Sequence, residues 1–240
     1  MNIVSDIGNS YTKVGIFDDD KLLQVIVITK NEYDKIHKLI PSGIYSSAIV
    51  SSVIETPAFL LNSLQKISNR ILIFDHTTKI PLKNKYKSQL TLGNDRLALA
   101  TGGAIFYKSK NILIIDAGSC ITYDFVNTTG TYLGGGISPG IDMRFKSLNM
   151  FTDKLPLLQK ENISIHIGRN TKQSILSGVM NGVYSEINSV INYYKNKYSN
   201  LKIVLTGGDA IFLAKKIKSR IFVEPNFLLL SLNQILLNND

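Results

Sequence analysis

The sequence Asp6-Ile7-Gly8-Asn9-Ser10 decides the fold, because it separates an apolar run, residues 1–4, from an alternating segment, residues 11–17. The first run is typical of a buried strand and the second of a half-exposed strand. Gly8 and Asn9 both tolerate a positive φ, so they favour a tight hairpin between the two strands.

This turn has a possible chemical use besides its structural one. Its backbone N–H groups can bind phosphate oxygens, and Asp6 can hold the Mg²⁺ that accompanies the phosphates. Ser10 and Lys13 would add further donors. An Asp-x-Gly turn is also common in hairpins that bind nothing, so the turn alone leaves both interpretations open.

A second copy of the pattern strengthens the functional interpretation. Residues 111–115 are apolar, Asp116-Ala117-Gly118-Ser119 follows, and residues 120–125 are again strand-like. The two aspartates lie 110 residues apart, an interval too long for a solenoid repeat. The spacing therefore predicts a duplicated domain, in which each half contributes one phosphate-binding hairpin to a shared cleft.

The composition is that of a globular protein. The 240 residues, 44% hydrophobic and 19% charged, are enough for one large domain or two smaller ones. Apolar runs stay shorter than the roughly 18 residues that span a bilayer, so we expect no membrane segment. Cys120 is the single cysteine, which excludes an internal disulfide and a CxxC metal site and favours the cytoplasm.

The net charge of +9 indicates an anionic partner, although lysines spread over a solvated surface explain it equally well. The densest cluster is Lys79, Lys83, Lys85 and Lys87, and only Tyr86 interleaves with it. Because no nucleic-acid-binding motif accompanies these lysines, a small anion is favoured over a nucleic acid.

The first half of the chain predicts a mixed sheet covered by helices. A third strand is expected at residues 22–28, and the elements that follow alternate between helix and strand. We expect them at residues 31–40 (helix), 48–50 (strand), 56–67 (helix) and 70–74 (strand). Three strands followed by this alternation is the ribonuclease-H-like order. The polar connector 76–92 is long enough to be functional, and a helix from Leu97 to about Tyr107 would link the halves.

The second half repeats the order with a longer helix. Expected strands are residues 111–115, 120–125, 132–135, 202–205 and 221–223, and expected helices are 141–148, 171–194, 210–217 and 226–237. Residues 136–140 and 206–209 are expected as Gly-rich loops, and 153–169 as irregular. The chain is thus predicted to be α/β, with two ribonuclease-H-like domains, 1–92 and 93–240. Each would be a mixed five-stranded sheet flanked by helices, with a cleft between the domains.

Five motifs carry a family resemblance. They are D-I-G-N-S-x-x-K at 6–13, G-N-D-R at 93–96, D-A-G-S at 116–119, G-G-G-I-S-P-G at 134–140 and T-G-G-D at 206–209. In this order they resemble the type III pantothenate kinases, of the acetate and sugar kinase/Hsp70/actin superfamily, over nearly the whole chain. The resemblance implies ATP-dependent phosphorylation of pantothenate to 4′-phosphopantothenate, the first step towards coenzyme A.

The resemblance also implies roles for particular residues. ATP would be bound by Asp6, Ile7, Gly8, Asn9, Ser10, Tyr11, Thr12, Lys13, Ser119, Gly207 and Gly208. Pantothenate would be bound by Tyr86, Gly93, Asn94, Asp95, Arg96 and, across a homodimer interface, Thr171. Asp95 would accept the hydroxyl proton, Asp116 would bind a monovalent cation (potassium or ammonium), and Asp6 would hold Mg²⁺ through the phosphates. Ser10 and Ser119 stand where the family more often has threonine.

Several of these residues also have an ordinary structural explanation. Asp95 can simply cap the helix after it, and Tyr86 can be a packing aromatic. The apolar stripe of the long helix, Ile175, Val179, Val183 and Ile187, can form a dimer interface or pack internally. Two alternative functions are another acetate- or sugar-kinase-like enzyme and a non-catalytic regulator that binds nucleotide or nucleic acid. The adjacent Asp95 and Arg96 favour an enzyme, because a regulator does not need them.

Overall fold

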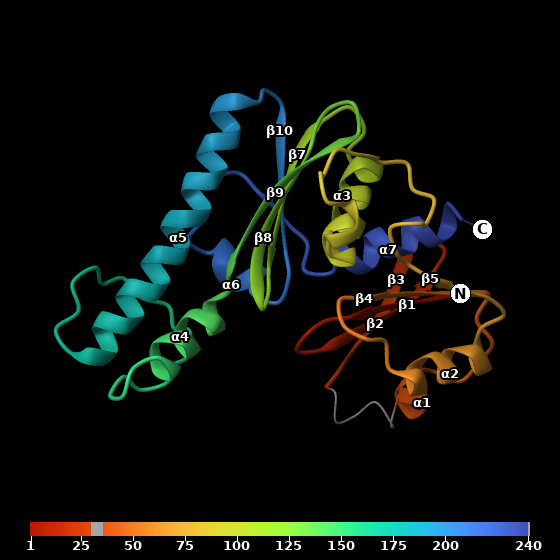
Figure 1. Ribbon diagram of the computed structural model, residues 1–240, viewed down its shortest axis with the longest axis horizontal. Helices are drawn as coiled ribbons and strands as arrows, with labels where there is room; N and C mark the ends of the chain where they lie inside the picture. The colour runs from red at the N-terminus through yellow and green to blue at the C-terminus, as the bar shows by residue number, and fades with distance from the viewer. Residues whose placement is uncertain (30–35, 240) are drawn as a thin grey trace. The chain divides into compact units, whose positions relative to one another are not determined.

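The computed structural model describes residues 1–29 and 36–239, and their contacts divide into two compact units (Figure 1). The first unit comprises Met1–Ser109, Val126–Gly134 and the C-terminal segment from Asn226. The second comprises Lys110–Phe125 and Gly135–Pro225. These units differ from a simple division at residue 92, because the chain leaves the first unit and returns to it twice.

The first unit is built on a five-stranded sheet of order β3-β2-β1-β4-β5. The strands are β1 (Asn2–Ile7), β2 (Thr12–Asp18), β3 (Lys21–Ile28), β4 (Ser47–Ser52) and β5 (Ile71–Ile73). β1, β2 and β3 pair antiparallel through short turns, whereas β4 pairs parallel with β1 and β5 with β4. Parallel neighbours need a crossover: α2 (Ala58–Ile67) lies between β4 and β5, and α1 (Ile36–Leu39) precedes β4. The start of the helix predicted at 31–40 lies outside the described residues.

Alternate residues of β1 and β4 face two different cores, as the two-residue period of a strand requires. Ile3, Ile7 and Val50 pack in one cluster with Leu60 and Leu64 of α2. Val4 and Ile49 face the other way, into a cluster with α3 (Asn94–Phe106) and α7 (Phe227–Leu237). Because Asp6 and Ser51 follow Val4 and Ile49 by two residues, they lie on the α3 side of the sheet.

The second sheet has six strands, in the order β11-β10-β7-β8-β9-β6, where five were predicted. They are β7 (Asn111–Ala117), β8 (Cys120–Val126), β9 (Thr131–Pro139), β10 (Leu201–Thr206), β11 (Phe222–Val223) and β6 (Lys83–Asn84). β6 comes from the predicted connector 76–92, which also contains the short 3₁₀ helix η2 (Gln89–Thr91), and it pairs parallel with β9. β9 extends to Pro139, so residues 136–139, predicted as a loop, continue the strand.

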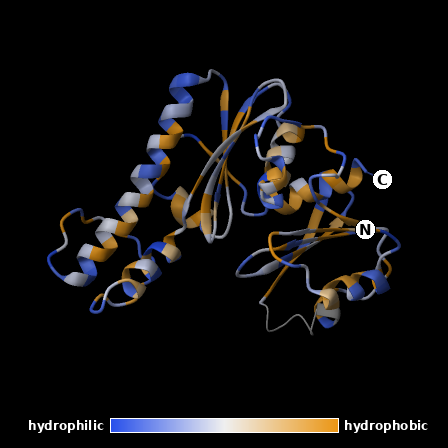
Figure 2. Ribbon diagram, viewed as in Figure 1, coloured by the Kyte–Doolittle hydropathy of each residue, from blue (hydrophilic) through white to orange (hydrophobic). Residues whose placement is uncertain are grey.

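The core of the second unit lies between its sheet and α4 (Ile141–Met150), α5 (Thr171–Lys197) and α6 (Ala210–Ala214). Ile175, Val179, Val183 and Ile187 of α5 are all buried there. Hydrophobic residues recur along α5 between hydrophilic turns, as an amphipathic helix on a sheet requires (Figure 2). The stripe therefore packs inside the unit, and it provides no dimer surface.

α3 begins at Asn94, three residues before the predicted start, and it packs with α7 against the first sheet. A side chain at Gly102 of α3 would collide with Ser231 of α7, so glycine permits this close contact. None of the helices among the described residues is long and apolar enough to cross a membrane.

Candidate active site

The first group of predicted site residues lies where β1 and β4 end. Asp6 is the penultimate residue of β1, and its register neighbours are Lys13 on β2 and Ser51 on β4. Register partners point to the same face of a sheet, so a carboxylate, an ammonium group and a hydroxyl lie side by side. The Lys13 ammonium group can bind a phosphate, and the Asp6 carboxylate can bind the cation that accompanies it.

The hairpin after Asp6 uses part of its own hydrogen-bonding capacity. The Gly8 N–H donates to the Tyr11 carbonyl oxygen at 3.0 Å, so this amide closes the turn. Asn9 and Ser10 are exposed at the tip, whereas the side chains of Ile7 and Thr12 are buried. In the middle of this motif, Asn9 and Ser10 are therefore the residues exposed for contact with a ligand.

The N-terminus of α3 is fixed to the same end of the sheet. The Asn94 side-chain amide donates to the carbonyl oxygens of Ser52 and Phe74, each at 3.2 Å. These carbonyls belong to the last residue of β4 and the residue after β5. One amide thus joins the first turn of α3 to two neighbouring strands.

Asp95 lies inside the first turn of α3 and does not cap it. The N-cap residue is Gly93, and the Asp95 Oδ1 accepts a hydrogen bond from the Arg96 backbone N–H at 2.7 Å. A Cβ atom at Gly93 would lie only 2.5 Å from this Oδ1. Asp95 is therefore not the N-cap residue, although its carboxylate satisfies one backbone N–H of the first turn, and Gly93 leaves room for the carboxylate.

Burial raises the pKa of the Asp95 carboxyl, and the Arg96 N–H bond and guanidinium charge oppose that rise only in part. A carboxylate with a raised pKa is a stronger base at neutral pH than an exposed one. This shift suits Asp95 to accept a proton from an alcohol.

Tyr86, in the polar segment 76–92, lies beside Arg96 of the G-N-D-R motif at the start of α3. The Arg96 guanidinium carbon is 5.8 Å from the centre of the Tyr86 ring, within cation–π range. Tyr86 also stacks on the buried Tyr132, with ring centres 6.1 Å apart, and its N–H donates to the Asn84 Oδ1. The structure thus brings Tyr86, Asp95 and Arg96 into one region of the first unit.

In the second unit, Asp116 lies next to the Gly-rich turn after β10. Asp116 pairs in register with Thr206, and a side chain at Gly207 would collide with the Asp116 carboxylate and the Ala117 carbonyl. The φ angle of Gly207 is +93°, in the region that favours glycine. Asp116 and Gly207, far apart in sequence, therefore form one site.

The D-A-G-S turn and the end of β9 also meet in this unit. The Gly140 N–H donates to the Ser119 carbonyl oxygen at 3.1 Å, and the Gly118 N–H closes the turn on the Cys120 carbonyl. Ser119 itself is exposed. These two backbone hydrogen bonds thus fix the turn, and the Ser119 side chain is left exposed to solvent.

Two further interactions were not predicted from the sequence. Lys160, in the irregular segment before α5, forms an ion pair with the buried Asp209 at the end of the Gly-rich turn. This pair joins the irregular segment to the predicted adenosine loop. A single lysine in an irregular stretch carries no signal by which sequence reasoning could have found it.

The second is a network around Glu186 of α5. Its carboxylate accepts hydrogen bonds from Arg144 Nη2 at 2.5 Å, Ser138 Oγ at 2.5 Å and Tyr123 Oη at 2.7 Å. Burial alone would raise the pKa of Glu186, but these bonds and the Arg144 charge outweigh it and lower the pKa. The network joins α5 to α4, β8 and β9.

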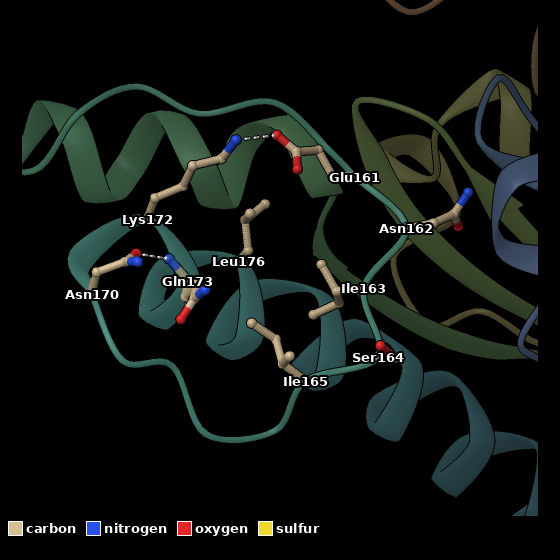
Figure 3. Close-up of a pocket in the computed structure, with 9 residues that line it drawn as sticks. All are labelled: Glu161, Asn162, Ile163, Ser164, Ile165, Asn170, Lys172, Gln173 and Leu176. Atoms are coloured by element: carbon tan, nitrogen blue, oxygen red, sulfur yellow. Dashed lines mark hydrogen bonds and ion pairs between the residues drawn. The ribbon is translucent and has the colours of Figure 1, made fainter.

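A pocket of about 360 Å³ lies around the first turn of α5 (Figure 3). Its apolar floor is Ile163, Ile165 and Leu176, and the Lys172–Glu161 ion pair of 2.8 Å lies at its edge. Thr171 is exposed, and Asn170 caps the helix through the Gln173 N–H. None of the residues predicted to bind ATP or pantothenate lines this pocket.

The described residues contain no group of three or more His, Cys, Asp or Glu side chains that could hold a metal ion. Each hairpin instead presents one strand-end carboxylate, Asp6 or Asp116. Mg²⁺ in kinases is usually held by one or two carboxylates together with substrate phosphates and water. These carboxylates therefore suit a cation that arrives with a nucleotide.

Solved structures with similar folds agree with this architecture. The chain matches a Campylobacter jejuni protein described as a Baf family transcriptional activator, with a TM-score of 0.66, 21% identity and coverage of 99% and 98% of the two chains. It also matches a Sinorhizobium meliloti protein described as a 2-dehydro-3-deoxygalactonokinase, with a TM-score of 0.59, 12% identity and 98% coverage of each chain. At these identities the likeness shows the fold alone, an α/β architecture shared over nearly the whole of each chain.

Sequence relatives identify the family. The family model described as type III pantothenate kinase matches residues 2–193. A type III pantothenate kinase from Flavobacterium johnsoniae is 43% identical over 98% of this chain and 96% of the relative. The relative from Christiangramia forsetii is 42% identical over 98% of both chains. The relative from Bacteroides fragilis is 38% identical over 100% of this chain and 99% of the relative. The chain belongs to the type III pantothenate kinase family.

Proposed function

We propose that this chain transfers the γ-phosphoryl group of ATP to pantothenate and forms 4′-phosphopantothenate. Family membership gives the reaction, and one structural observation carries the assignment of its chemistry. Asp95, with a raised pKa, lies beside Arg96 and near Tyr86 at the N-terminus of α3. A base, a cationic donor and an aromatic hydroxyl in one place are what an alcohol acceptor requires.

In this proposal Asp95 receives the proton of the pantothenate hydroxyl on a carboxylate oxygen. Phosphoryl transfer has a loose transition state, so the alcohol becomes acidic late and a carboxylate is a sufficient base. Arg96 and Tyr86 bind and orient the acceptor. Asn94 fixes the first turn of α3 to β4 and β5, which holds Asp95 in place.

Each of the two hairpins offers donors that suit the phosphates of ATP. Asn9, Ser10 and Lys13 contribute donors from the first, Ser119 contributes from the second, and Gly207-Gly208 binds the adenosine. Mg²⁺, held by Asp6 through the phosphates, and a potassium or ammonium ion at Asp116 would neutralise phosphate charge when bound. The carboxylate donors present at both strand ends agree with both ions.

We further propose a homodimer in which Thr171 contacts the partner's pantothenate. The apolar stripe of α5 does not support this proposal, because its residues are buried in the core of the second unit. Support comes from exposed apolar residues near the helix start, since Ile167 is 83% exposed only four residues before Thr171. Met150 and Phe151, at the end of α4, are 76% and 80% exposed. Apolar side chains of this size mark an interaction surface where they form one contiguous patch.

The experiment that tests the reaction is an ADP-release assay with ATP and Mg²⁺, run with pantothenate, with hexoses and with no acceptor. Pantothenate-dependent ADP release supports the proposal. Release that depends on a sugar would favour another sugar-kinase-like enzyme, and nucleotide binding without turnover would favour a regulator. A cytoplasmic location stays a prediction from the single cysteine.

A further inference from the structure

Two buried hydroxyl groups occupy corresponding places in the two halves of the chain. Among the described residues, five buried side-chain atoms have no hydrogen-bond partner, and Ser51 Oγ and Thr206 Oγ1 are two of them. The side chains are 0% and 1% exposed. A hydroxyl buried without a partner loses its hydrogen bonds to water, so each normally has a compensating role.

The strand registers show what each hydroxyl faces. Ser51 on β4 is the parallel register partner of Asp6 on β1, and Thr206 on β10 is the parallel register partner of Asp116 on β7. Partners in register point to the same face of a sheet at neighbouring positions. Each strand-end carboxylate thus has a buried hydroxyl beside it.

A further buried serine shows that burial alone does not produce this arrangement. Ser5 Oγ is likewise buried and has no partner among the described residues. It lies one residue before Asp6, on the opposite face of the sheet, and its register partners are Val14 and Val50. Ser5 therefore faces an apolar core, whereas Ser51 faces a carboxylate.

The chemistry of a hydroxyl suits the space between a carboxylate and a hard cation. Its oxygen offers lone pairs to the cation or to one of the cation's waters, while its proton is donated to the carboxylate. Mg²⁺ and potassium both prefer oxygen ligands. A hydroxyl that is unsatisfied without the ion gains its partners when the ion binds.

We propose that Ser51 and Thr206 supply the second protein oxygen of two cation sites whose first oxygens come from Asp6 and Asp116. The Asp6–Ser51 pair binds the Mg²⁺ that accompanies ATP, and the Asp116–Thr206 pair binds the monovalent cation. This inference rests on the proposed kinase function, to which it adds two ligand residues: Ser51, which lies outside the sequence motifs, and Thr206, the first residue of the T-G-G-D motif, to which the resemblance gave no role.

The Mg²⁺ site is tested by calorimetric titration of ADP at increasing Mg²⁺ concentrations, for the wild type, Ser51→Ala and the matched control Ser5→Ala. Loss of a hydrogen bond to a charged group should raise the half-saturating Mg²⁺ concentration about tenfold in Ser51→Ala. Ser5→Ala should match the wild type. Thermal unfolding without ligand should show no loss of stability in Ser51→Ala, because the hydroxyl has no partner in that state.

The monovalent site is tested through the potassium concentration that half-saturates the rise in melting temperature with ADP and Mg²⁺. Thr206→Val removes the hydroxyl at constant shape and should raise that concentration about tenfold. Thr206→Ser keeps the hydroxyl and should restore the wild-type value. A fold defect would affect both Thr206 variants without ligand, so their comparison separates binding from folding.

The proposal is overturned if Ser51→Ala equals Ser5→Ala and Thr206→Val equals Thr206→Ser, or if the loss is confined to one pair. Failure of the kinase function looks different. The wild type itself would then show neither Mg²⁺-dependent ADP binding nor pantothenate-dependent ADP release, and this inference would fall with it.

Discussion

At the scale of single residues, Asp95 gives the sharpest test. We expect Asp95→Asn to lower kcat by about 10²- to 10⁴-fold, the usual loss when a general base is removed. The fold should not suffer, because asparagine can also accept the Arg96 N–H bond. The measurement pairs kcat at saturating ATP and pantothenate with a thermal melt. A variant with more than about a tenth of the wild-type kcat would show that Asp95 is not the base.

The raised pKa of Asp95 makes two predictions of opposite sign. Activity should fall as pH decreases through this pKa, above the ordinary value of 3.8, because the base must be ionised. Stability should behave the other way: the folded state holds the Asp95 proton more tightly than the unfolded state, so ionisation lowers the free energy of unfolding as pH rises. Asp95→Asn should therefore melt at or above the wild-type temperature at pH 7. A lower melting temperature would contradict the pKa shift.

Neighbouring glycines of the Gly-rich turn should respond differently to alanine. Gly207→Ala should lower the free energy of unfolding by about 1–3 kcal/mol, because of its φ of +93° and the collision with Asp116 and Ala117. A Cβ at Gly208 meets nothing within 4 Å, so Gly208→Ala should leave stability unchanged and weaken only ATP binding. Chemical denaturation and ATP titration of both variants test this, and equal stability of the two would show that the turn does not need Gly207.

At the scale of elements, the Glu186 network predicts a pH-dependent contribution to stability. We expect Glu186→Gln to lower the free energy of unfolding at pH 7 by about 1.5 kcal/mol, the lower end for hydrogen bonds to a charged group. Because the folded-state pKa is depressed, this contribution is present above the unfolded value of 4.5 and is lost as pH falls through the folded value. Denaturation curves from pH 7 to pH 3 should converge for the two proteins, and a constant gap would contradict the charge-based explanation.

Elements were predictable where local pattern decides them. The strand–turn–strand units at Asp6 and Asp116 and the long helix at Thr171 follow from periodicity and turn residues, and the structure contains them. The predicted loop at 136–140 failed because pairing with a neighbouring strand extends β9 through its glycines. β6 is only two residues long, and its pairing with β9 defines it as a strand. A segment this short has no hydrophobic periodicity from which a strand could be predicted.

The candidate site was predictable only where a motif carried it. Asp95, Arg96 and Tyr86 were identified by resemblance, and the structure shows what fixes their positions: the Asn94 contacts, the stacking of Tyr86 on Tyr132 and the Arg96–Tyr86 contact. Ser51, Lys160 and Glu186 were missed because their partners are distant in sequence. Such contacts depend on strand register and helix packing, which one sequence does not reveal.

At the scale of the whole molecule, the proposed dimer is tested by mixing two inactive variants. Asp95→Asn removes the base of its own site, and Thr171→Arg, at an exposed position, should impair the partner's site without harming the fold. In a mixed dimer, the Thr171→Arg protomer keeps its own Asp95 and receives an intact Thr171 from the Asp95→Asn protomer. One of the two sites is then complete.

Random exchange of equal amounts makes half of the dimers mixed, so activity should recover to about a quarter of the wild-type value in a twofold-symmetric dimer. Each variant alone should stay nearly inactive, and native mass spectrometry should follow the exchange. The control is a double variant, Asp95→Asn with Thr171→Arg, mixed with Asp95→Asn. Because neither partner then keeps Asp95, exchange restores no activity. Full exchange of the two single variants without recovery would mean that Thr171 serves its own protomer's site, and full activity of Thr171→Arg by itself would mean that Thr171 serves no site.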